Sequence, residues 1–302
     1  MSRPSFRRSP LARAATAALL ATLVAACDDS TGPDGGPTAV QSAQVGAVLQ
    51  DEVETDVGAV MIEAAVTPVF VKGDVGADLF ANAVSPCTAP SNTTDTDGDG
   101  IYDDATITYT APACTRTNRR GGTVTLTGAL RIQDPTPNAA GLAFNHTLTD
   151  LTFSFTGGGV AARTYTVSRT GTRNVAVSGS GASLASDLTI TRTFNAGDPA
   201  TVVKSWDVTY TPAVGSSIVV GQPLPSGTLS ATGSVQWTRG SEAFSLTVTT
   251  PTPLVHDATC DAAQRFTAGE LRAQGTFNGK NGYLRIRWNG CGVEPSVVFI
   301  AI

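Results

Sequence analysis

Carboxylates alternate with other residues in one short segment of the chain. Asp95, Asp97 and Asp99 are spaced two residues apart, with Gly98 and Gly100 beside them. Carboxylates at alternate positions of a turn converge on one cation, and glycine permits the sharp turn that this requires. Five aspartates within ten residues also repel one another at neutral pH unless a cation or salt screens them. The spacing therefore predicts a Ca²⁺ site with a structural rather than a catalytic role.

The same segment resembles the Asp-x-Asp-x-Asp-Gly calcium loops of EF-hand-like, dockerin and thrombospondin type 3 repeats. The resemblance implies that the carbonyl of Ile101 and the side chain of Asp103 are further ligands. Thr106 stands where such loops carry a bidentate Glu, so Asp104 or a residue from another strand is expected to complete the shell. The alternative is an acidic hairpin tip that binds no metal.

A second chemical feature lies near the N-terminus. Four arginines and no acidic residue precede an apolar run over residues 14–26, which is too short to span a bilayer as a mature helix. A positive start, a short apolar middle and small residues at the cut are typical of a secretory signal. The run ends in Leu23-Val24-Ala25-Ala26-Cys27, which resembles the lipobox of bacterial lipoprotein precursors.

That resemblance implies cleavage before Cys27, a diacylglycerol on its thiol and a third acyl chain on its new amino group. Buried methylene groups contribute about 0.8 kcal/mol each, so several chains anchor a protein firmly to a membrane. We therefore expect a lipid-anchored protein of the cell envelope, with the membrane as its partner. The choice of inner membrane, outer membrane or cell surface stays open, and an ordinary signal peptide with a coincidental cysteine is the alternative.

Composition excludes one class of partner. The leader holds four of the 20 basic residues and none of the 25 acidic ones, which leaves 16 basic against 25 acidic and a net charge of −9. Nucleic-acid binding needs a basic stripe to neutralise phosphates, so nucleic acid is not expected as a partner. The ligand or protein partner of the chain is not indicated.

Four cysteines remain besides Cys27, and an even count in an exported chain implies two disulfides. Three pairings are possible. We favour Cys87–Cys114 and Cys260–Cys291, because each pair brackets a short segment that contains a loop. A zinc site is disfavoured, since the chain has no Cys-x-x-Cys spacing and only two histidines.

The mature chain divides into a tether, a helix and one β domain. Residues 27–37 are polar and rich in Gly and Pro, which is typical of a flexible tether. Residues 38–66 carry apolar side chains at helical spacing, with Thr38 and Gln41 placed as a capping box and Thr67-Pro68 ending the helix. We expect the apolar face to pack on the β domain of residues 67–302 and the opposite face to expose Asp51, Glu52, Glu54, Asp56 and Glu63.

From about residue 105 the hydrophobic period changes to two. Residues 123–132 place Val124, Leu126, Leu130 and Ile132 on one face, and the later segments repeat this alternation between turn signals. The parity slips near Thr149-Asp150, which predicts a β-bulge. Long sequential strands with one polar face predict an all-β, curved or barrel-like antiparallel meander with one N-terminal amphipathic helix. A two-sheet sandwich is the alternative.

No recognisable catalytic motif is present. His146 shares parity with Phe144 and Leu148, which favours a histidine that faces the core. The β region resembles the uncharacterised Thr/Ser/Gly-rich β domains of exported lipoproteins, a resemblance that implies no activity. We expect a non-catalytic binding or structural domain. A carrier of lipid or small apolar ligands and a surface carbohydrate-binding module are the alternatives, and an enzyme is less favoured.

Overall fold

The computed structural model describes residues 35–60, 87–117, 122–157, 164–178, 180–194, 197–218, 224–260 and 266–302. The leader, Cys27 and the predicted end of the helix at Thr67-Pro68 lie outside these ranges. Residues 35–37, the end of the predicted tether, lie beside the turn that follows Phe277, where Asn278 Nδ2 donates to the Gly36 carbonyl over 3.3 Å. No helix among the described residues is long and apolar enough to cross a membrane.

The helix α1 spans Ala39–Val60 and begins where the sequence predicts. Thr38 N donates to Gln41 Oε1 (2.7 Å) and Gln41 N donates to Thr38 Oγ1 (3.1 Å), so the predicted capping box is present. The apolar positions on its inner face are buried, as expected: Val45, Val48, Leu49 and Val53. Three of the carboxylates expected on its outer face, Glu52, Glu54 and Asp56, are buried as well.

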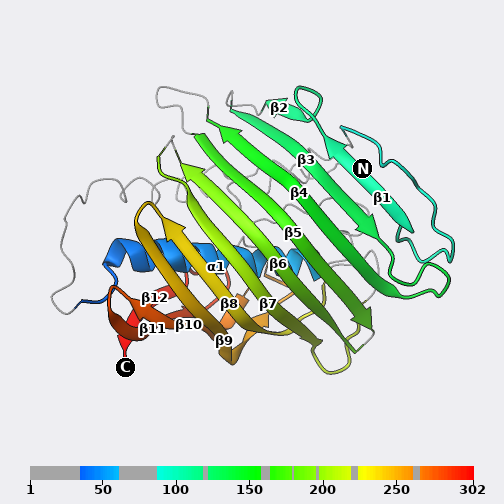
Figure 1. Cartoon of the computed structure of the whole chain (residues 1–302). Coiled ribbons are helices and arrows are strands. Elements are labelled where there is room, and N and C mark those ends of the chain that lie inside the picture. Colours follow the sequence, from blue (N-terminus) through cyan, green and yellow to red (C-terminus); the bar gives the residue numbers. More distant parts are fainter. Residues whose placement is uncertain are drawn as a thin grey trace, which may run out of the picture.

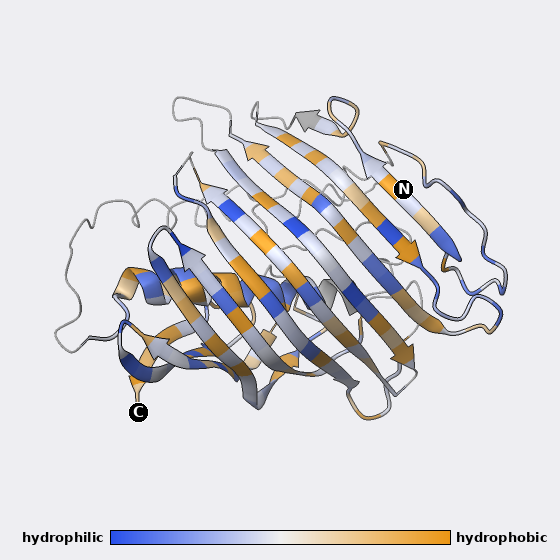
Figure 2. Cartoon of the chain, viewed as in Figure 1, coloured by the Kyte–Doolittle hydropathy of each residue, from blue (hydrophilic) through white to orange (hydrophobic). Residues whose placement is uncertain are grey.

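The strands form one antiparallel meander in the order β1-β3-β4-β5-β6-β7-β8-β9-β10-β11-β12, with β2 pairing β3. The alternation of apolar and polar residues that predicted these strands is visible along them in Figure 2. Within the described residues, β1 and β12 do not pair with each other, so the sheet is curved but not closed into a barrel. The strands are β1 Asp104–Tyr109, β2 Thr115–Thr117, β3 Thr123–Gln133, β4 Leu142–Thr156, β5 Thr164–Ser178, β6 Gly181–Phe194, β7 Ala200–Pro212, β8 Gly227–Arg239, β9 Glu242–His256, β10 Phe266–Phe277, β11 Lys280–Trp288 and β12 Ser296–Ala301.

Local irregularities bend the sheet. The register of β4 and β5 shifts between Leu148 and Leu151, and Asp150 adopts a φ of 46°, which confirms the predicted bulge. In β5, Gly171 adopts a φ of 137°, and a Cβ there would lie 2.1 Å from the Asp187 carbonyl oxygen of β6. Only glycine permits this backbone and this close approach, so Gly171 contributes to the curvature at the centre of the sheet.

The core lies between the concave face of the sheet and α1. Figure 1 shows α1 behind β6–β8, with β10–β12 turning away beneath it. The N-terminal half of α1 contacts the C-terminal edge, where a Cβ on Gly46 would lie 2.7 Å from Val297 of β12. Its C-terminal half reaches β5, β6 and β7 through Glu52 and Asp56.

The concave face differs along its width. Toward the C-terminal edge, Trp237, Phe244, Phe277 and Phe299 follow one another across β8, β9, β10 and β12, with successive ring centroids 5.1–5.3 Å apart. Such spacing is favourable for aromatic pairs. At the centre, by contrast, basic side chains from β5, β6 and β7 point to the same face. The helix crosses both regions.

Candidate functional sites

The predicted metal loop lies immediately before β1 and is held by bonds between its own carboxylates and backbone amides. Asp95 accepts hydrogen bonds from Gly98 N (2.8 Å) and Gly100 N (3.0 Å), and Asp99 accepts one from Ile101 N (2.8 Å). Gly98 and Gly100 adopt φ angles of 78° and 92°, a conformation that glycine permits without strain.

This folding gathers the three predicted carboxylates. One oxygen from each of Asp95, Asp97 and Asp99 lies within 4.8 Å of the other two, so the cluster could hold a metal ion. The three side chains are half-buried. Desolvation raises the pKa of Asp97, and repulsion from neighbouring carboxylates adds to this increase. The predicted spacing therefore does bring these three ligands together.

A fourth carboxylate, which was not predicted from the sequence, lies beside the loop. Asp134 follows β3, and its amide donates to the carbonyls of Tyr102 (3.1 Å) and Asp103 (3.2 Å). Its side chain is 6 % exposed and contributes to the repulsion that raises the pKa of Asp97. Asp134 Oδ1 accepts from Thr136 N (2.7 Å), whereas Oδ2 has no hydrogen-bond partner among the described residues.

The other predicted ligands have different surroundings. Asp103 accepts hydrogen bonds from Thr96 N (2.9 Å) and Thr96 Oγ1 (2.5 Å), which lower the pKa of its carboxyl. Asp104 forms a two-point ion pair with Arg131 at 2.8 and 2.6 Å. The Ile101 side chain is buried in the core, and ligation by its carbonyl stays a prediction. Asp104 is thus engaged by Arg131, whereas Asp134 is a nearby carboxylate that keeps one oxygen without a hydrogen bond among the described residues.

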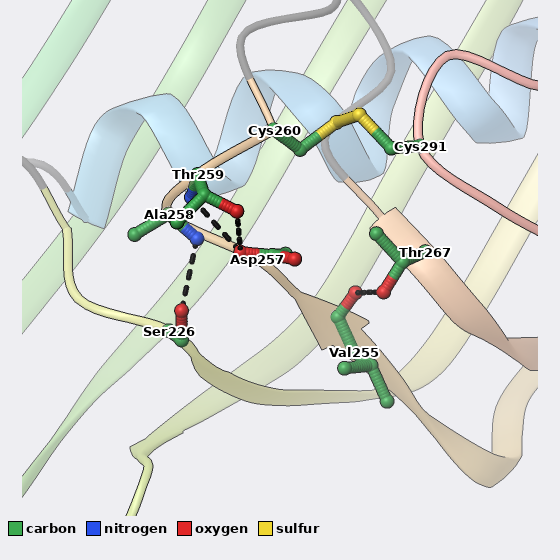
Figure 3. The surroundings of a disulfide bond; sticks show 8 residues. All are labelled: Ser226, Val255, Asp257, Ala258, Thr259, Cys260, Thr267 and Cys291. Carbon is green, nitrogen blue, oxygen red and sulfur yellow. Dashed lines mark hydrogen bonds between the residues drawn. A yellow bond between two sulfur atoms is a disulfide. The ribbon is translucent and has the colours of Figure 1, made fainter.

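Both predicted disulfides are present. Cys87–Cys114 closes the excursion that carries the metal loop, and Cys260–Cys291 joins the segment after β9 to the segment after β11. Figure 3 shows the second bond beside the turn in which Asp257 accepts hydrogen bonds from Thr259. Structural disulfides form in oxidising compartments, so the pair indicates an extracytoplasmic protein.

The carboxylates of α1 form a second charged site, and here the sequence prediction was wrong. Glu52, Glu54 and Asp56 were expected on the exposed face of the helix, but they are 1 %, 3 % and 0 % exposed, and Asp51 is half-buried. The side chain of Glu63 lies outside the described residues. The physical reason is that the sheet presents basic partners to this face of α1.

Two carboxylates one helical turn apart hold these contacts. Glu52 accepts hydrogen bonds from Arg192 Nη2 (2.8 Å), Arg169 Nη2 (3.3 Å) and Lys204 Nζ (3.0 Å). Asp56 accepts from Lys204 Nζ (3.0 and 3.2 Å) and from Trp206 Nε1 (2.5 Å), and it lies 3.4 Å from Arg173 Nη2. Arg192 also pairs with Asp51. We call Glu52, Asp56, Arg169, Arg173, Arg192 and Lys204 the buried ion-pair cluster.

Electrostatics keeps Glu52 charged in this cluster. Burial alone would raise the pKa of its carboxyl, but Lys204, Arg169, Arg192 and Arg173 together hold it well below its usual range. Burial lowers the pKa of the Arg173 guanidinium, and the nearby Asp56 and Glu52 carboxylates oppose this effect. The charges of α1 and of the sheet therefore compensate each other.

A sequence signal for the basic half of the cluster existed. Arg192 has the parity of Leu188 and Ile190 in β6, and Lys204 has the parity of Val202 and Trp206 in β7. A strand alternates its faces, so these bases had to point toward the core. Basic residues at core positions require anionic partners, and the acidic side chains of the N-terminal helix could supply them.

Both histidines are buried on the inner side of the sheet. His146 lies beside Phe144, with ring centroids 4.8 Å apart, which confirms the predicted core-facing position. Burial and the charge of Arg173 lower the pKa of His146 to about 3, so its ring is neutral at physiological pH. His256 Nδ1 lies 3.1 Å from the Pro225 carbonyl.

No protein-family model, curated protein or solved structure matches this chain.

Proposed function

We propose that this chain is a lipid-anchored protein of the bacterial cell envelope, with a non-catalytic binding β domain that one calcium ion stabilises. The lipobox-like segment ending at Cys27 supports the anchor. The two disulfides support a location outside the cytoplasm. The observation that carries the calcium assignment is the convergence of the Asp95, Asp97 and Asp99 carboxylates. Beside them, Asp134 is buried, and its Oδ2 has no hydrogen-bond partner among the described residues.

The donor set fits calcium. Calcium takes six to eight oxygen ligands and accepts flexible geometry, whereas magnesium requires a near-ideal octahedron and keeps its water. The carboxylates of Asp95, Asp97, Asp99 and Asp134 would supply the charge, with water or backbone carbonyls completing the shell. A bound cation would cancel the repulsion that raises the pKa of Asp97. It would also tie the loop to the end of β3, which stabilises the β1 edge of the sheet.

A carbohydrate-binding role is less well supported. Such a site needs exposed aromatic side chains beside polar groups, and Trp206, Trp237 and Trp288 are 3 %, 1 % and 1 % exposed. Together these are all the tryptophans of the chain. A binding role that uses the inner face of the sheet is the more consistent alternative, because that face combines charge with apolar surface.

Thermal unfolding with and without calcium tests the metal assignment. At a calcium concentration about 100 times its Kd, one site adds about 2.7 kcal/mol, which corresponds to a rise in Tm of about 5–10 °C for a domain of this size. Asp97→Asn and Asp134→Asn should lose this response. Asp104→Asn is the matched control, because Asp104 pairs with Arg131, and it should keep the response.

A wild-type protein whose Tm does not change at millimolar calcium would contradict the site. A response that survives in Asp134→Asn would contradict the role of the fourth carboxylate.

Fractionation tests the anchor separately. The wild-type chain should enter the membrane fraction and incorporate labelled fatty acid, and Cys27→Ser should lose both properties. Labelling of the Cys27→Ser variant to the wild-type level would contradict a lipid attached at this residue.

A further inference from the structure

Next to Asp56, the concave face of the sheet carries a row of polar side chains with unused hydrogen-bonding capacity. His146, Arg173 and Ser186 are lateral neighbours on β4, β5 and β6, and they are 5 %, 6 % and 1 % exposed. His146 Nε2, Arg173 Nε and Nη2, and Ser186 Oγ have no hydrogen-bond partner among the described residues. A buried polar group without a partner costs about 1–3 kcal/mol, so four such atoms in one row require an explanation.

Arg173 is the centre of this row. Its Nη2 makes an ion pair with Asp56 Oδ1 at 3.4 Å but no hydrogen bond, so this contact with α1 uses neither Nη2 nor Nε as a hydrogen-bond donor. A guanidinium presents its N–H groups in a rigid fork that matches carboxylate and phosphate oxygens. The Ser186 hydroxyl lies beside it and can donate to the same group. The row therefore has the chemistry of an oxyanion site.

Aliphatic side chains surround the basic ones on this face. The lateral partner of Arg192 is Val167, that of Arg169 is Ile190, and that of Lys204 is Leu188. These three aliphatic residues are at most 2 % exposed. A ligand that pairs with both the basic and the aliphatic side chains of this face must combine an anionic group with apolar surface. A bare inorganic anion therefore fits less well.

The helix satisfies the same requirement from within the chain. It offers the carboxylates of Glu52 and Asp56 to the basic side chains and Val45, Leu49 and Val53 to the apolar surface. Buried ion pairs add little stability compared with well-packed apolar contacts, because both charges lose their hydration. When α1 leaves the sheet, however, the charged side chains on both surfaces can be hydrated. Ionic contacts are therefore suited to a helix that exchanges with a ligand.

We infer that the concave face of β4–β7 binds an anionic amphiphile, a molecule with a carboxylate or phosphate head group and an alkyl chain, and that α1 occupies this face when the ligand is absent. Arg173 and Ser186 bind the head group, and the aliphatic neighbours of the basic side chains contact the chain. The inference rests on the proposed binding role of the β domain and names its class of ligand.

Fluorescence titration tests the site. Trp206 donates to Asp56 of α1, so departure of the helix should shift its emission to longer wavelength. The indole nitrogens of Trp237 and Trp288 have no hydrogen-bond partner among the described residues, so they lose no such bond. The full-length chain carrying Cys27→Ser is titrated with oleate below its micelle concentration and, separately, with phosphatidylglycerol vesicles. Phosphatidylcholine vesicles and inorganic phosphate serve as controls. We expect a saturable shift with oleate or phosphatidylglycerol and none with the controls.

A matched pair of variants separates ligand binding from structural stability. Ser186→Ala removes a buried hydroxyl that has no hydrogen-bond partner in the described part of the chain, so it should not lower Tm. It should weaken binding about three- to tenfold, because the hydrogen bond to the ligand is lost. Ser183→Ala changes an exposed serine of the same strand and should leave binding unchanged. A merely structural Ser186 would leave the affinity of both variants at the wild-type value.

A crosslink tests the role of α1. A Cβ on Gly46 would lie 3.3 Å from the Cβ of Val297, near the separation of about 3.8 Å that disulfides prefer. Oxidised Gly46→Cys/Val297→Cys should bind neither oleate nor phosphatidylglycerol, whereas Val297→Cys alone should bind as the wild type does.

Equal binding by the crosslinked protein would overturn the exchange of α1 with ligand. A response to inorganic phosphate equal to that of oleate would overturn the amphiphile. Failure of the wild type to bind either oleate or phosphatidylglycerol would overturn the site, and a calcium-dependent rise in Tm in that same protein would leave the proposed function standing.

Discussion

The metal loop and the buried ion-pair cluster both gather carboxylates, but the groups that face those carboxylates differ. In the loop, Asp95, Asp97 and Asp99 face one another and the backbone amides of their own turn. Under α1, Glu52 and Asp56 face basic side chains from three strands. The first site could hold a cation from solution, whereas the second carries its own cations.

This difference also decides what sequence reasoning can find. The loop is local, so a spacing of two residues was enough to predict that its three carboxylates meet. The partners in the cluster are 117 to 152 residues apart, and only the pairing of strands brings them together. An acidic helix face is usually solvated, and that general expectation failed here because the sheet presented bases to it.

Removing one cation from the cluster should have the largest effect. Lys204 is fully buried and contacts both Glu52 and Asp56, so Lys204→Met leaves two buried carboxylates with less compensation. We expect a loss of about 3–5 kcal/mol in the free energy of unfolding. Urea unfolding measures it. Arg131→Met, which breaks an exposed ion pair, is the control and should lose much less stability. Equal losses of unfolding free energy in Lys204→Met and Arg131→Met would show that the buried cluster is no more sensitive to losing a cation than the exposed pair.

Acid should lower the free energy of unfolding at a pH where most carboxylates are still ionised, because of groups buried at the concave face. The pKa of His146 is lowered to about 3 in the folded chain, so below about pH 6.5 the unfolded state binds a proton that the folded state does not. Stability therefore falls with decreasing pH, by up to about 1.4 kcal/mol per pH unit. Glu52, whose folded pKa is also lowered, adds to this loss below about pH 4.5. His146→Asn should flatten the decline between pH 6.5 and 5, and an unchanged slope would show that the ring is not a buried neutral group.

The cap of α1 should have a smaller effect. Thr38→Ala removes the side-chain oxygen that accepts from Gln41 N, at a cost of about 0.5–2 kcal/mol. If ion pairs contribute more than the cap to holding α1 on the sheet, Thr38→Ala should lose less free energy of unfolding than Lys204→Met in the same urea experiment. A larger loss from Thr38→Ala would show that the cap contributes more than the ion pairs.

Much of the fold was predictable because it depends on local rules. Alternation along residues 123–132 placed Val124, Leu130 and Ile132 on the inner face, and the parity slip located the bulge at Asp150. The capping box set the start of α1. Long-range relations were not predictable in this way. Asp134 approaches the loop because β1 pairs with β3. Glu52 is buried because the pairing of β5, β6 and β7 gathers its basic partners on one face.

Thermal unfolding in EDTA of Asp97→Asn and Glu52→Gln compares the two sites most directly. Neutralising Asp97 relieves repulsion in a loop that lacks a cation, so its Tm should rise above that of the wild type. Neutralising Glu52 leaves buried cations without their partner, so its Tm should fall by several degrees. Shifts of opposite sign are what this account predicts, and shifts of the same sign would contradict it.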